Sequence, residues 1–345
     1  MIESRGGAEV AVRMKDIADD LGVSLMTVSK ALRNHSDISE KTRDRVLKRM
    51  RELNYQPDWI ARSMVTGRTY LVGLVLPDLM HSFFAEVAKG VARKLQPMGY
   101  QVVISDTEED GGIERRQVGV LVNRKVDGLI IASAQHNGRL ELFQMLDRNK
   151  IPYVLIDRIL PGTQASYVGV KDDDLGALAT EHLIAQGCRK IAHIRGPAVA
   201  TGTGRLRGYR RALARHGMTA RPQHIASGAY GDNTGYEAMQ QLLRASPRPD
   251  GVFCYNDPVA AGAIKAILEA RLHVPEDIAV IGAGNVHYSD LLRVPLSTVD
   301  QSSSTIGETA ADLLLQSMES KKPAAAQRIF IPPRLVVRDS SRRKG

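Results

Sequence analysis

Polar and aromatic side chains follow most of the apolar segments that we expect to form strands between residues 70 and 290. These side chains are Asp78, Phe83, Phe84, Asp157, Arg158, Thr201, Arg205, Tyr230, Asn256, Asp257 and Asn285. In open parallel sheets, ligands bind beyond the carboxyl ends of the strands. Aromatic faces can cover an apolar ring face, while charged and amide groups can bind hydroxyl or acid groups. The pattern predicts a cleft for a small polar ligand, although polar residues also end strands simply as helix caps.

Patterns for catalysis are weaker. The segment Gly202-Thr-Gly-Arg-Leu-Arg-Gly208 loosely resembles a dinucleotide-binding turn, but its spacing is GxGxxxG and no acidic residue ends a strand about 20 positions later. Cys254 has no evident partner that would activate it as a nucleophile. The nine histidines show neither HxH nor HExxH spacing. We therefore expect no enzyme activity, no cofactor and no metal.

A second kind of chemistry is indicated near the N-terminus, where residues 15–33 read as two short helices separated by a turn at Gly22. Ser24 is a suitable N-cap for the second helix. Apolar residues face inward from both helices, namely Ile17, Ala18, Leu21, Val28, Ala31 and Leu32. The outward face of the second helix carries Leu25, Met26, Ser29 and Lys30. A face with one cation and no acid suits a reader of the DNA major groove, although an ordinary helical corner is the alternative.

A third helix is predicted to begin after Ser39 and to run to about Leu53, with Val46, Leu47, Met50 and Leu53 facing inward. Its many cations are expected to be solvated, with one or two near the helix start reaching phosphate. Pro57 and Gly67 then bracket a helix of about two turns, which is marginal in water. This segment is either a plain linker or a helix that orders only against DNA or a symmetry mate.

From Leu71 onward the pattern becomes α/β. Apolar, β-rich segments recur at 71–76, 102–105, 128–132, 154–156, 167–170, 191–194, 252–255 and 278–281, with helical patterns between most of them. Continuous apolar strands alternating with helices predict parallel sheets covered on both faces. Some 270 residues exceed one core, so two lobes are expected.

Composition limits the environment and the partners. The chain has 345 residues, of which 43% are hydrophobic, and its 47 basic and 38 acidic residues give a net charge of +9. This balance weakly favours a polyanionic partner. Cys188 and Cys254 lack metal-type spacing and are expected to be reduced. No apolar segment has the length of a signal peptide or a membrane span, so we expect a cytoplasmic protein without a membrane partner.

Short motifs along nearly the whole chain resemble one family, the lactose-repressor (LacI/GalR) transcription regulators. In the first half these are Lys15-Asp-Ile-Ala, Gly22-Val-Ser, Thr27-Val-Ser, Val46-Leu, Leu53-Asn-Tyr-Gln-Pro57, Ala61-Arg-Ser, Gly73-Leu-Val-Leu-Pro-Asp78, Phe83-Phe-Ala-Glu86, Val126-Asp-Gly-Leu-Ile130 and Ile156-Asp-Arg158. In the second half they are Arg205-Leu-Arg-Gly-Tyr209, Phe253-Cys-Tyr-Asn-Asp257, Val274-Pro-Glu-Asp-Ile278 and Pro295-Leu-Ser-Thr-Val299. In this order and spacing the set is specific.

The resemblance implies an all-α helix-turn-helix head (residues 1–57), a hinge helix and linker (58–69) and a two-lobed, periplasmic-binding-protein-like α/β core (70–340). It places the N-lobe at about 70–158 and 291–320, and the C-lobe at about 159–290 and 321–340. It also implies a dimeric repressor of a pseudo-palindromic operator. The implied DNA contacts are Lys15, Ser24, Leu25, Met26, Thr27, Ser29, Lys30, Asn34, Tyr55, Ala61, Arg62 and Met64.

The resemblance further implies that the polar and aromatic side chains at the strand ends bind a small-molecule effector in the interlobe cleft, and that this effector controls DNA binding. One departure bears on the effector's class. Relatives usually carry an aromatic residue and an acid after the Ile278–Ile281 segment, whereas this chain has Gly282-Ala-Gly-Asn285. Because this carboxylate is missing while Arg158 and Arg205 remain, a sugar acid is favoured as the effector over a neutral sugar, which stays an alternative. The alternatives are a solute-binding protein for transport, which the helical head argues against, and a nicotinamide-dependent enzyme.

No leucine heptads follow Arg338, so a homodimer is expected rather than a tetramer. Such a regulator would be associated with the nucleoid.

Overall fold

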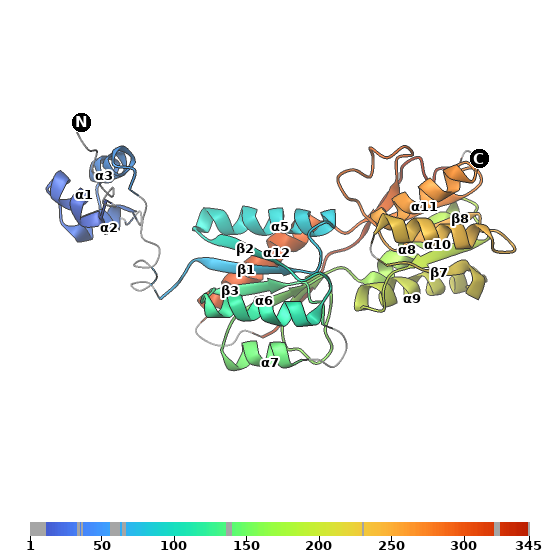
Figure 1. The fold of residues 1–345 in the computed structure, drawn as a ribbon, viewed down its shortest axis with the longest axis horizontal. Coiled ribbons are helices and arrows are strands. Elements are labelled where there is room, and N and C mark those ends of the chain that lie inside the picture. Colours follow the sequence, from blue (N-terminus) through green and yellow to red (C-terminus); the bar gives the residue numbers. More distant parts are fainter. Residues whose placement is uncertain are drawn as a thin grey trace, which may run out of the picture. The chain divides into compact units, whose positions relative to one another are not determined.

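The computed structural model describes residues 12–32, 35, 37–55, 63, 67–135, 140–229, 231–320 and 325–343. The chain divides into two compact units, Met1–Thr69 and Tyr70–Gly345. Figure 1 shows the first as a small helical unit and the second as two sheets, each with helices packed on it.

The N-terminal unit contains α1 (Met14–Leu21), α2 (Leu25–Leu32) and α3 (Glu40–Glu52). Gly22 ends α1 in the left-handed region at φ 66°, which glycine adopts without steric cost. The side chains of Ser24 and Ser39 accept hydrogen bonds from the backbone nitrogens of Thr27 (3.0 Å) and Thr42 (3.3 Å), so each caps the helix that follows it. These local signals explain why the helices begin and end where the sequence predicted.

The small core of this unit consists of Ile17, Ala18, Val28, Ala31, Val46 and Met50, all buried. Leu47, predicted to face inward, is 37% exposed. The prediction was wrong because successive helical residues point about 100° apart, and Val46 and Met50 already occupy the inward stripe. Leu47 instead lines a shallow hollow of about 400 Å³ together with Met50, Arg51, Asn54 and Tyr55.

Three arginines of α3 that were expected to be solvated have partners within the head. Arg49 pairs with Asp20 of α1, and Arg45 donates to the carbonyl of Leu21 at 3.4 Å. Arg43 donates to the carbonyl of His35, in the α2–α3 loop, at 3.3 Å. These contacts tie α3 to its neighbours.

The second unit contains two six-stranded sheets. One, in the order β11-β5-β4-β3-β1-β2, is parallel throughout. Its strands are β1 (Leu71–Leu76), β2 (Gln101–Asp106), β3 (Gly128–Ile131), β4 (Tyr153–Ile156), β5 (Ser166–Gly169) and β11 (Arg328–Phe330). The other has the order β12-β10-β9-β8-β6-β7, in which only β12 runs antiparallel. Its strands are β6 (Ile191–Arg195), β7 (Ile225–Ser227), β8 (Gly251–Cys254), β9 (Ala279–Gly284), β10 (Ser297–Asp300) and β12 (Arg334–Val336).

Helices of the first sheet's lobe, the N-lobe, are α5 (Ser82–Leu95), α6 (Gly111–Asn123), α7 (Glu141–Arg148) and α12 (Ser303–Glu319). Those of the C-lobe are α8 (Asp172–Ala185), α9 (Ala200–Arg215), α10 (Asp232–Leu243) and α11 (Asp257–Glu269). Two 3-10 turns, η1 (Gln96–Met98) and η2 (Pro222–His224), also belong to the described part of the core. Neighbouring helices approach very closely: a Cβ on Gly90 of α5 would lie 2.2 Å from the Ser304 carbonyl oxygen of α12.

The expected lobe boundaries need correction. Residues 159–170 were assigned to the C-lobe, but β5 pairs with β4 in the N-lobe sheet. Residues 291–300 were assigned to the N-lobe, but β10 pairs with β9 in the C-lobe sheet. Residues 328–330 were assigned to the C-lobe, but β11 pairs with β5 in the N-lobe sheet. The chain therefore crosses between lobes in three short segments, 170–171, 301–302 and 331–333. Strands β7, β10, β11 and β12 were not predicted because three or four residues of mixed polarity leave no readable alternation.

A buried histidine in the C-lobe makes stability depend on pH. His193 of β6 is fully buried beside the rings of Phe253 and Tyr209, and its Nδ1 lies 2.9 Å from the Phe253 carbonyl oxygen. Burial lowers the pKa of His193 to about 3, from 6.5 in a solvated histidine. The buried neutral ring contributes fully to the free energy of unfolding above pH 6.5. This contribution is lost as the pH falls toward 3, because over that range only the unfolded chain binds the proton.

Between pH 7.5 and pH 5, we expect the free energy of unfolding to fall by about 2 kcal/mol less in the His193→Phe variant than in the wild type. Urea unfolding of both proteins at several pH values measures this slope. His216→Gln, at an exposed position, is the control and should keep the wild-type slope. An unchanged slope in His193→Phe would show that this imidazole is not responsible.

Candidate functional site

The exposed face of α2 is the first candidate site. Leu25 and Met26 are 52% and 60% exposed, although both are large apolar side chains. The hydroxyls of Ser24 and Thr27 lie 2.9 Å apart at the start of the helix. One turn later, Lys30 forms an ion pair of 2.5 Å with Asp37 of the α2–α3 loop. The face therefore combines an apolar tip with a paired, accessible cation.

Other predicted DNA contacts are distributed around the head. Lys15 is exposed on α1, whereas Ser29 and Tyr55 are partly buried. Asn34, Ala61, Arg62 and Met64 lie outside the described residues, as does the proposed hinge helix apart from Ser63. Their roles stay predictions.

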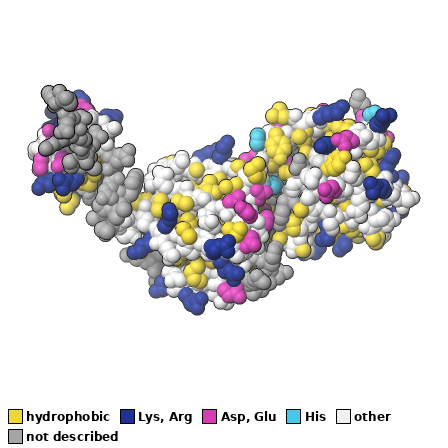
Figure 2. All heavy atoms as spheres, in the orientation of Figure 1, with side chains coloured by type: hydrophobic (Ala, Val, Ile, Leu, Met, Phe, Trp, Pro, Cys, Tyr) yellow, Lys and Arg dark blue, Asp and Glu magenta, His cyan; other side chains and the backbone are white. Residues whose placement is uncertain are grey.

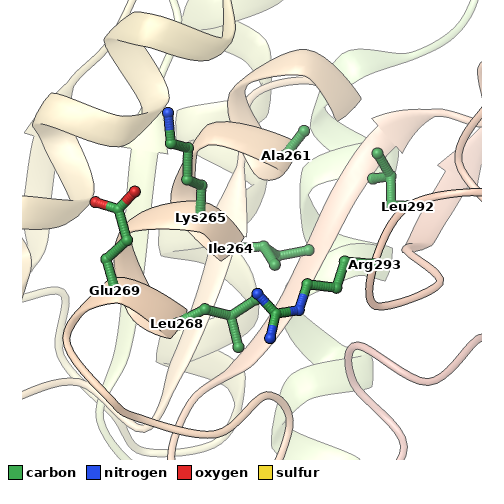
Figure 3. A pocket seen from close by; sticks show the side chains of 7 residues that line it. All are labelled: Ala261, Ile264, Lys265, Leu268, Glu269, Leu292 and Arg293. Carbon is green, nitrogen blue, oxygen red and sulfur yellow. The ribbon is translucent and has the colours of Figure 1, made fainter.

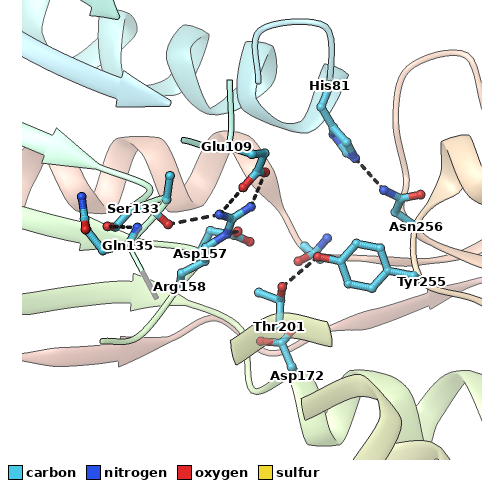
Figure 4. Close-up of polar contacts among 12 residues, drawn as sticks. His81, Glu109, Ser133, Gln135, Asp157, Arg158, Asp172, Thr201, Tyr255 and Asn256 are labelled. Carbon is cyan, nitrogen blue, oxygen red and sulfur yellow. Dashed lines mark hydrogen bonds and ion pairs between the residues drawn. The ribbon is translucent and has the colours of Figure 1, made fainter. Parts of the chain in front are cut away.

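The second candidate site lies in the core, where Arg158 follows β4. This side chain is 4% exposed, and its two terminal nitrogens donate to the two carboxylate oxygens of Glu109 at 2.7 and 2.5 Å (Figure 4). It also donates to the Ser133 carbonyl oxygen at 3.1 Å, and its Nε lies 3.6 Å from Asp157. Glu109 reaches it from a left-handed backbone conformation at φ 57°. The guanidinium is thus oriented and compensated by groups from three strand ends.

Arg205 of α9 is a second buried arginine of the core and is 3% exposed. It donates to Asp172 at 2.9 Å, to the Tyr255 carbonyl oxygen at 2.6 Å and to the side chain of Gln301 at 3.0 Å. Its guanidinium lies over the Tyr255 ring, 4.7 Å from the ring centre. Thr201, one turn earlier on α9, is hydrogen-bonded to the Tyr255 hydroxyl at 2.8 Å.

A hydrogen bond between two described side chains joins the lobes directly. The amide nitrogen of Asn256 lies 3.1 Å from Nε2 of His81, in the loop before α5 (Figure 4). Burial lowers the pKa of His81 to about 4, so the ring is neutral at pH 7. Phe83 and Phe84, in the first turn of α5, pack edge-to-face against each other and are 3% and 5% exposed. Both rings also pack edge-on against the ring of His81.

Acidic groups outnumber basic groups at the site. Carboxyl groups of Glu109, Asp157 and Asp172 face the guanidinium groups of Arg158 and Arg205. Burial raises the pKa of Asp157 and raises that of Asp172 to about 6, against the effect of the neighbouring arginines. On the face drawn in Figure 2, acidic side chains also gather on the N-lobe beside the C-lobe. The arrangement offers hydrogen-bond acceptors and donors, with no surplus of positive charge.

Two other predicted effector contacts have their polar groups occupied. Asp257 is fully buried, and its carboxylate accepts from the hydroxyls of Thr298 (2.6 Å) and Ser289 (2.8 Å) and from the backbone nitrogen of Val286 (3.0 Å). The side-chain oxygen of Asn285 accepts from Arg338 at 2.9 Å. The structure therefore places Asp257 in the C-lobe interior rather than among the cleft residues.

Asp78 lies in the loop that follows β1. Its carboxylate accepts a hydrogen bond from the backbone nitrogen of Met80, two residues later, at 2.8 Å. Tyr230 lies outside the described residues.

Five site residues were not predicted: His81, Glu109, Asp172, Tyr255 and Gln301. Tyr255 and His81 are close in sequence to predicted residues and could have been found from that proximity. Glu109 depends on an unusual backbone conformation, and Gln301 follows β10, which was not recognised. For those two the sequence carries no local signal.

Two hollows lie in the described part of the core, and one of them borders these residues. One, of about 610 Å³, borders the site and is lined from the N-lobe by Asp157, Tyr167 and Phe330 and from the C-lobe by Asp172 and Thr203, among others. The other, of about 390 Å³, lies on α11 and contains none of the predicted effector residues (Figure 3). The first is the one that can extend a ligand site between the lobes.

The GxGxxxG segment lies within α9 rather than in a strand-to-helix turn. A Cβ on Gly204 would lie 2.6 Å from Asp172 Cβ, and one on Gly208 would lie 2.2 Å from the Asp173 carbonyl oxygen. These glycines therefore allow α8 and α9 to pack closely, which accounts for the motif without a nucleotide. Within the described part of the chain, no group of three or more His, Cys, Asp or Glu side chains could hold a metal ion, and no helix is long and apolar enough to cross a bilayer.

Two family models match this chain. The model for bacterial regulatory proteins of the lacI family matches residues 13–58, and that for a periplasmic binding protein-like domain matches residues 180–341. The ribose operon repressor of Escherichia coli (strain K12) is 34% identical over 336 residues, covering 95% of this chain and 99% of the relative. The transcriptional repressor PurR of Haemophilus influenzae (strain PittEE) is 32% identical over 331 residues, covering 95% and 98%.

Solved structures give the same result. A lac repressor dimer bound to operator and the anti-inducer ONPF is similar with a TM-score of 0.83, at 27% identity over 96% of this chain and 99% of that one. A complex of the transcriptional regulator CelR with cellobiose has a TM-score of 0.73, at 30% identity over 95% and 99%.

Proposed function

Because this chain belongs to the lacI family of bacterial regulatory proteins, we propose that it represses transcription as a homodimer whose operator binding is controlled by a small neutral sugar. The chain is a DNA-binding regulator with a helix-turn-helix head and a periplasmic-binding-protein-like core. Its relatives are repressors rather than enzymes. The dimer, the effector class and the residue roles are the finer parts of the proposal.

The exposed tip of α2 supports the DNA-reading part. Leu25 and Met26 can make only apolar contacts, such as to a thymine methyl, while Lys30 can donate to guanine O6 and N7. Two heads related by a twofold axis would read the two halves of a pseudo-palindrome. A lac repressor dimer on its operator is a structural relative, which supports the same stoichiometry here.

The single observation that carries the effector part is the pairing of both buried arginines. A sugar acid was favoured from the sequence because Arg158 and Arg205 were expected to be available for an anion. Glu109 and Asp172 already compensate them, so an acidic ligand would add negative charge beside three carboxyl groups. A neutral polyhydroxylated ring can instead bind the oxygen and nitrogen edges of these pairs and stack on the Phe83 and Phe84 side.

Control of DNA binding would follow from lobe closure. The Asn256–His81 hydrogen bond joins the lobes in this arrangement, and a ligand that binds one arrangement better shifts the balance by that difference in affinity. The segment 58–66 would carry the change to the heads, as the sequence predicts. We expect the effector to release DNA and the protein to act in the cytoplasm, on nucleoid DNA.

An operator selected from a random duplex library tests the DNA-binding part. The full chain should enrich a pseudo-palindrome, with binding that weakens steeply as salt rises. Fluorescence anisotropy with the selected duplex then measures affinity. Failure to enrich any palindromic sequence would contradict the proposal.

Titrating sugars into the protein–operator complex tests the effector part. Neutral pentoses, hexoses and cellobiose are compared with their aldonic acids, and an active sugar should raise the operator Kd about 5- to 150-fold. Release by aldonic acids alone, or tighter operator binding with a neutral sugar, would contradict the charge argument and the expected direction respectively.

A further inference from the structure

The loop between α2 and α3 places a carboxylate beside the only cation on the described α2 helix. Asp37 Oδ2 lies 2.5 Å from Lys30 Nζ, and Oδ1 lies 2.6 Å from Nδ1 of His35. The hydrogen bond from Lys30 lowers the pKa of Asp37, so the carboxylate is ionised at neutral pH. The side chains of Lys30 and Asp37 are 32% and 46% exposed. A ligand approaching α2 therefore meets both charges.

Backbone contacts hold this carboxylate in place. The backbone nitrogen of His35 donates to the Lys30 carbonyl oxygen at 3.1 Å, and that of Ile38 donates to the His35 carbonyl oxygen at 3.3 Å. Arg43 of α3 donates to the same His35 oxygen at 3.3 Å. The loop is thus tied to the end of α2 on one side and to α3 on the other. Asp37 is positioned before DNA is bound.

An ionised carboxylate on a DNA-reading face is unfavourable unless a base edge compensates it, because the duplex carries dense negative charge. Cytosine offers such compensation, since its N4 amino group is a donor in the major groove. The paired guanine presents two acceptors, O6 and N7, which suit an ammonium group. Lys30 and Asp37 can contact the two bases of one pair while they stay paired with each other, because Lys30 has three donors and a carboxylate has about four acceptor positions.

We propose that Lys30 and Asp37 act together as a reader of one G·C pair, with Asp37 as a specificity-determining residue. This rests on the proposed DNA-reading role of α2. Lysine alone would also tolerate adenine, whose N7 is an acceptor. Asp37 removes that tolerance, because the thymine paired with adenine would present its O4 acceptor and its methyl group to the carboxylate instead of a donor. A T·A pair offers Lys30 only the O4 acceptor of thymine, where guanine offers two acceptors.

Parallel selections from one random duplex library test the proposal. The full-length wild type, Lys30→Ala, Asp37→Asn and Asp44→Asn are compared, and Lys30→Ala identifies the position that Lys30 reads. Asp44 is exposed on α3 and serves as the matched control for loss of one negative charge. An exposed ion pair contributes little to stability, so Asp37→Asn should fold normally.

We expect Asp37→Asn to lose preference for G·C at the Lys30-dependent position by about fivefold or more, since 1 kcal/mol of discrimination corresponds to about fivefold. Its affinity for a random-sequence duplex should stay the same or rise, because a negative charge is removed. Asp44→Asn should keep the wild-type motif.

Three results would overturn the inference: an Asp37→Asn motif identical to that of the wild type, equal weakening on all duplexes, or a Lys30-dependent position that is not G·C. In each of these the wild type still selects an operator, so the proposed function survives. A wild type that selects no sequence would instead refute the proposed function itself.

Discussion

Replacing Arg205 by leucine is expected to destabilise the core by about 3 to 5 kcal/mol. The guanidinium is 3% exposed and bonded to Asp172, the Tyr255 carbonyl and Gln301. Leucine fills much of the volume but leaves Asp172 buried without its counter-ion. Urea unfolding of the full chain, followed by circular dichroism, measures the free energy of unfolding.

A neighbouring arginine on the same helix provides the control. Arg207 pairs with Asp173 at 2.8 Å but is 61% exposed, so Arg207→Leu should cost less than about 1 kcal/mol. The double substitution Arg205→Leu with Asp172→Asn should recover part of the lost stability, since the unpaired charge is gone. Equal costs for Arg205→Leu and Arg207→Leu would refute the buried-pair explanation.

The same substitution bears on function. Arg205 also positions Gln301 and the Tyr255 ring, both beside the proposed effector. Arg205→Leu protein that remains folded should bind operator but no longer release it with sugar.

The second large effect is expected for Asp257→Ala, which should destabilise the C-lobe by about 3 to 5 kcal/mol. Alanine leaves three buried donors without an acceptor: the Val286 backbone nitrogen and the hydroxyls of Ser289 and Thr298. Asp257→Asn should cost less, because one oxygen remains while the amide nitrogen faces a donor. The free energy of unfolding is again the measurement.

Asp290, exposed in the same 286–296 loop, is the matched control, and Asp290→Ala should change stability little. Effector response separates the structural role of Asp257 from the binding role first predicted for it. Asp257→Asn should release operator at the same sugar concentration as the wild type. A large shift in that concentration would show that Asp257 takes part in effector binding.

Much of the fold is readable from local patterns in the sequence. Gly22, Ser24 and Ser39 mark helix ends through backbone conformation and capping, which depend on a few neighbouring residues. Eight strands of the core are long or apolar enough to be recognised. Short strands such as β10, which contains buried Ser297 and Thr298, are stabilised by pairing partners far along the chain and leave no periodic signal.

The residues of the two sites also divide into those that local sequence patterns reveal and those that depend on long-range contacts. The sequence by itself determined which side chains follow the strands and that α2 exposes Leu25 and Met26, because periodicity and strand ends are local properties. Only the tertiary structure decided which charges are paired: Glu109 with Arg158, 49 positions apart, and Arg205 with Gln301, 96 positions apart. It also buried Asp257 among three donors. Such pairings depend on where the chain crosses between lobes and on desolvation, and both are properties of the folded chain rather than of any local segment.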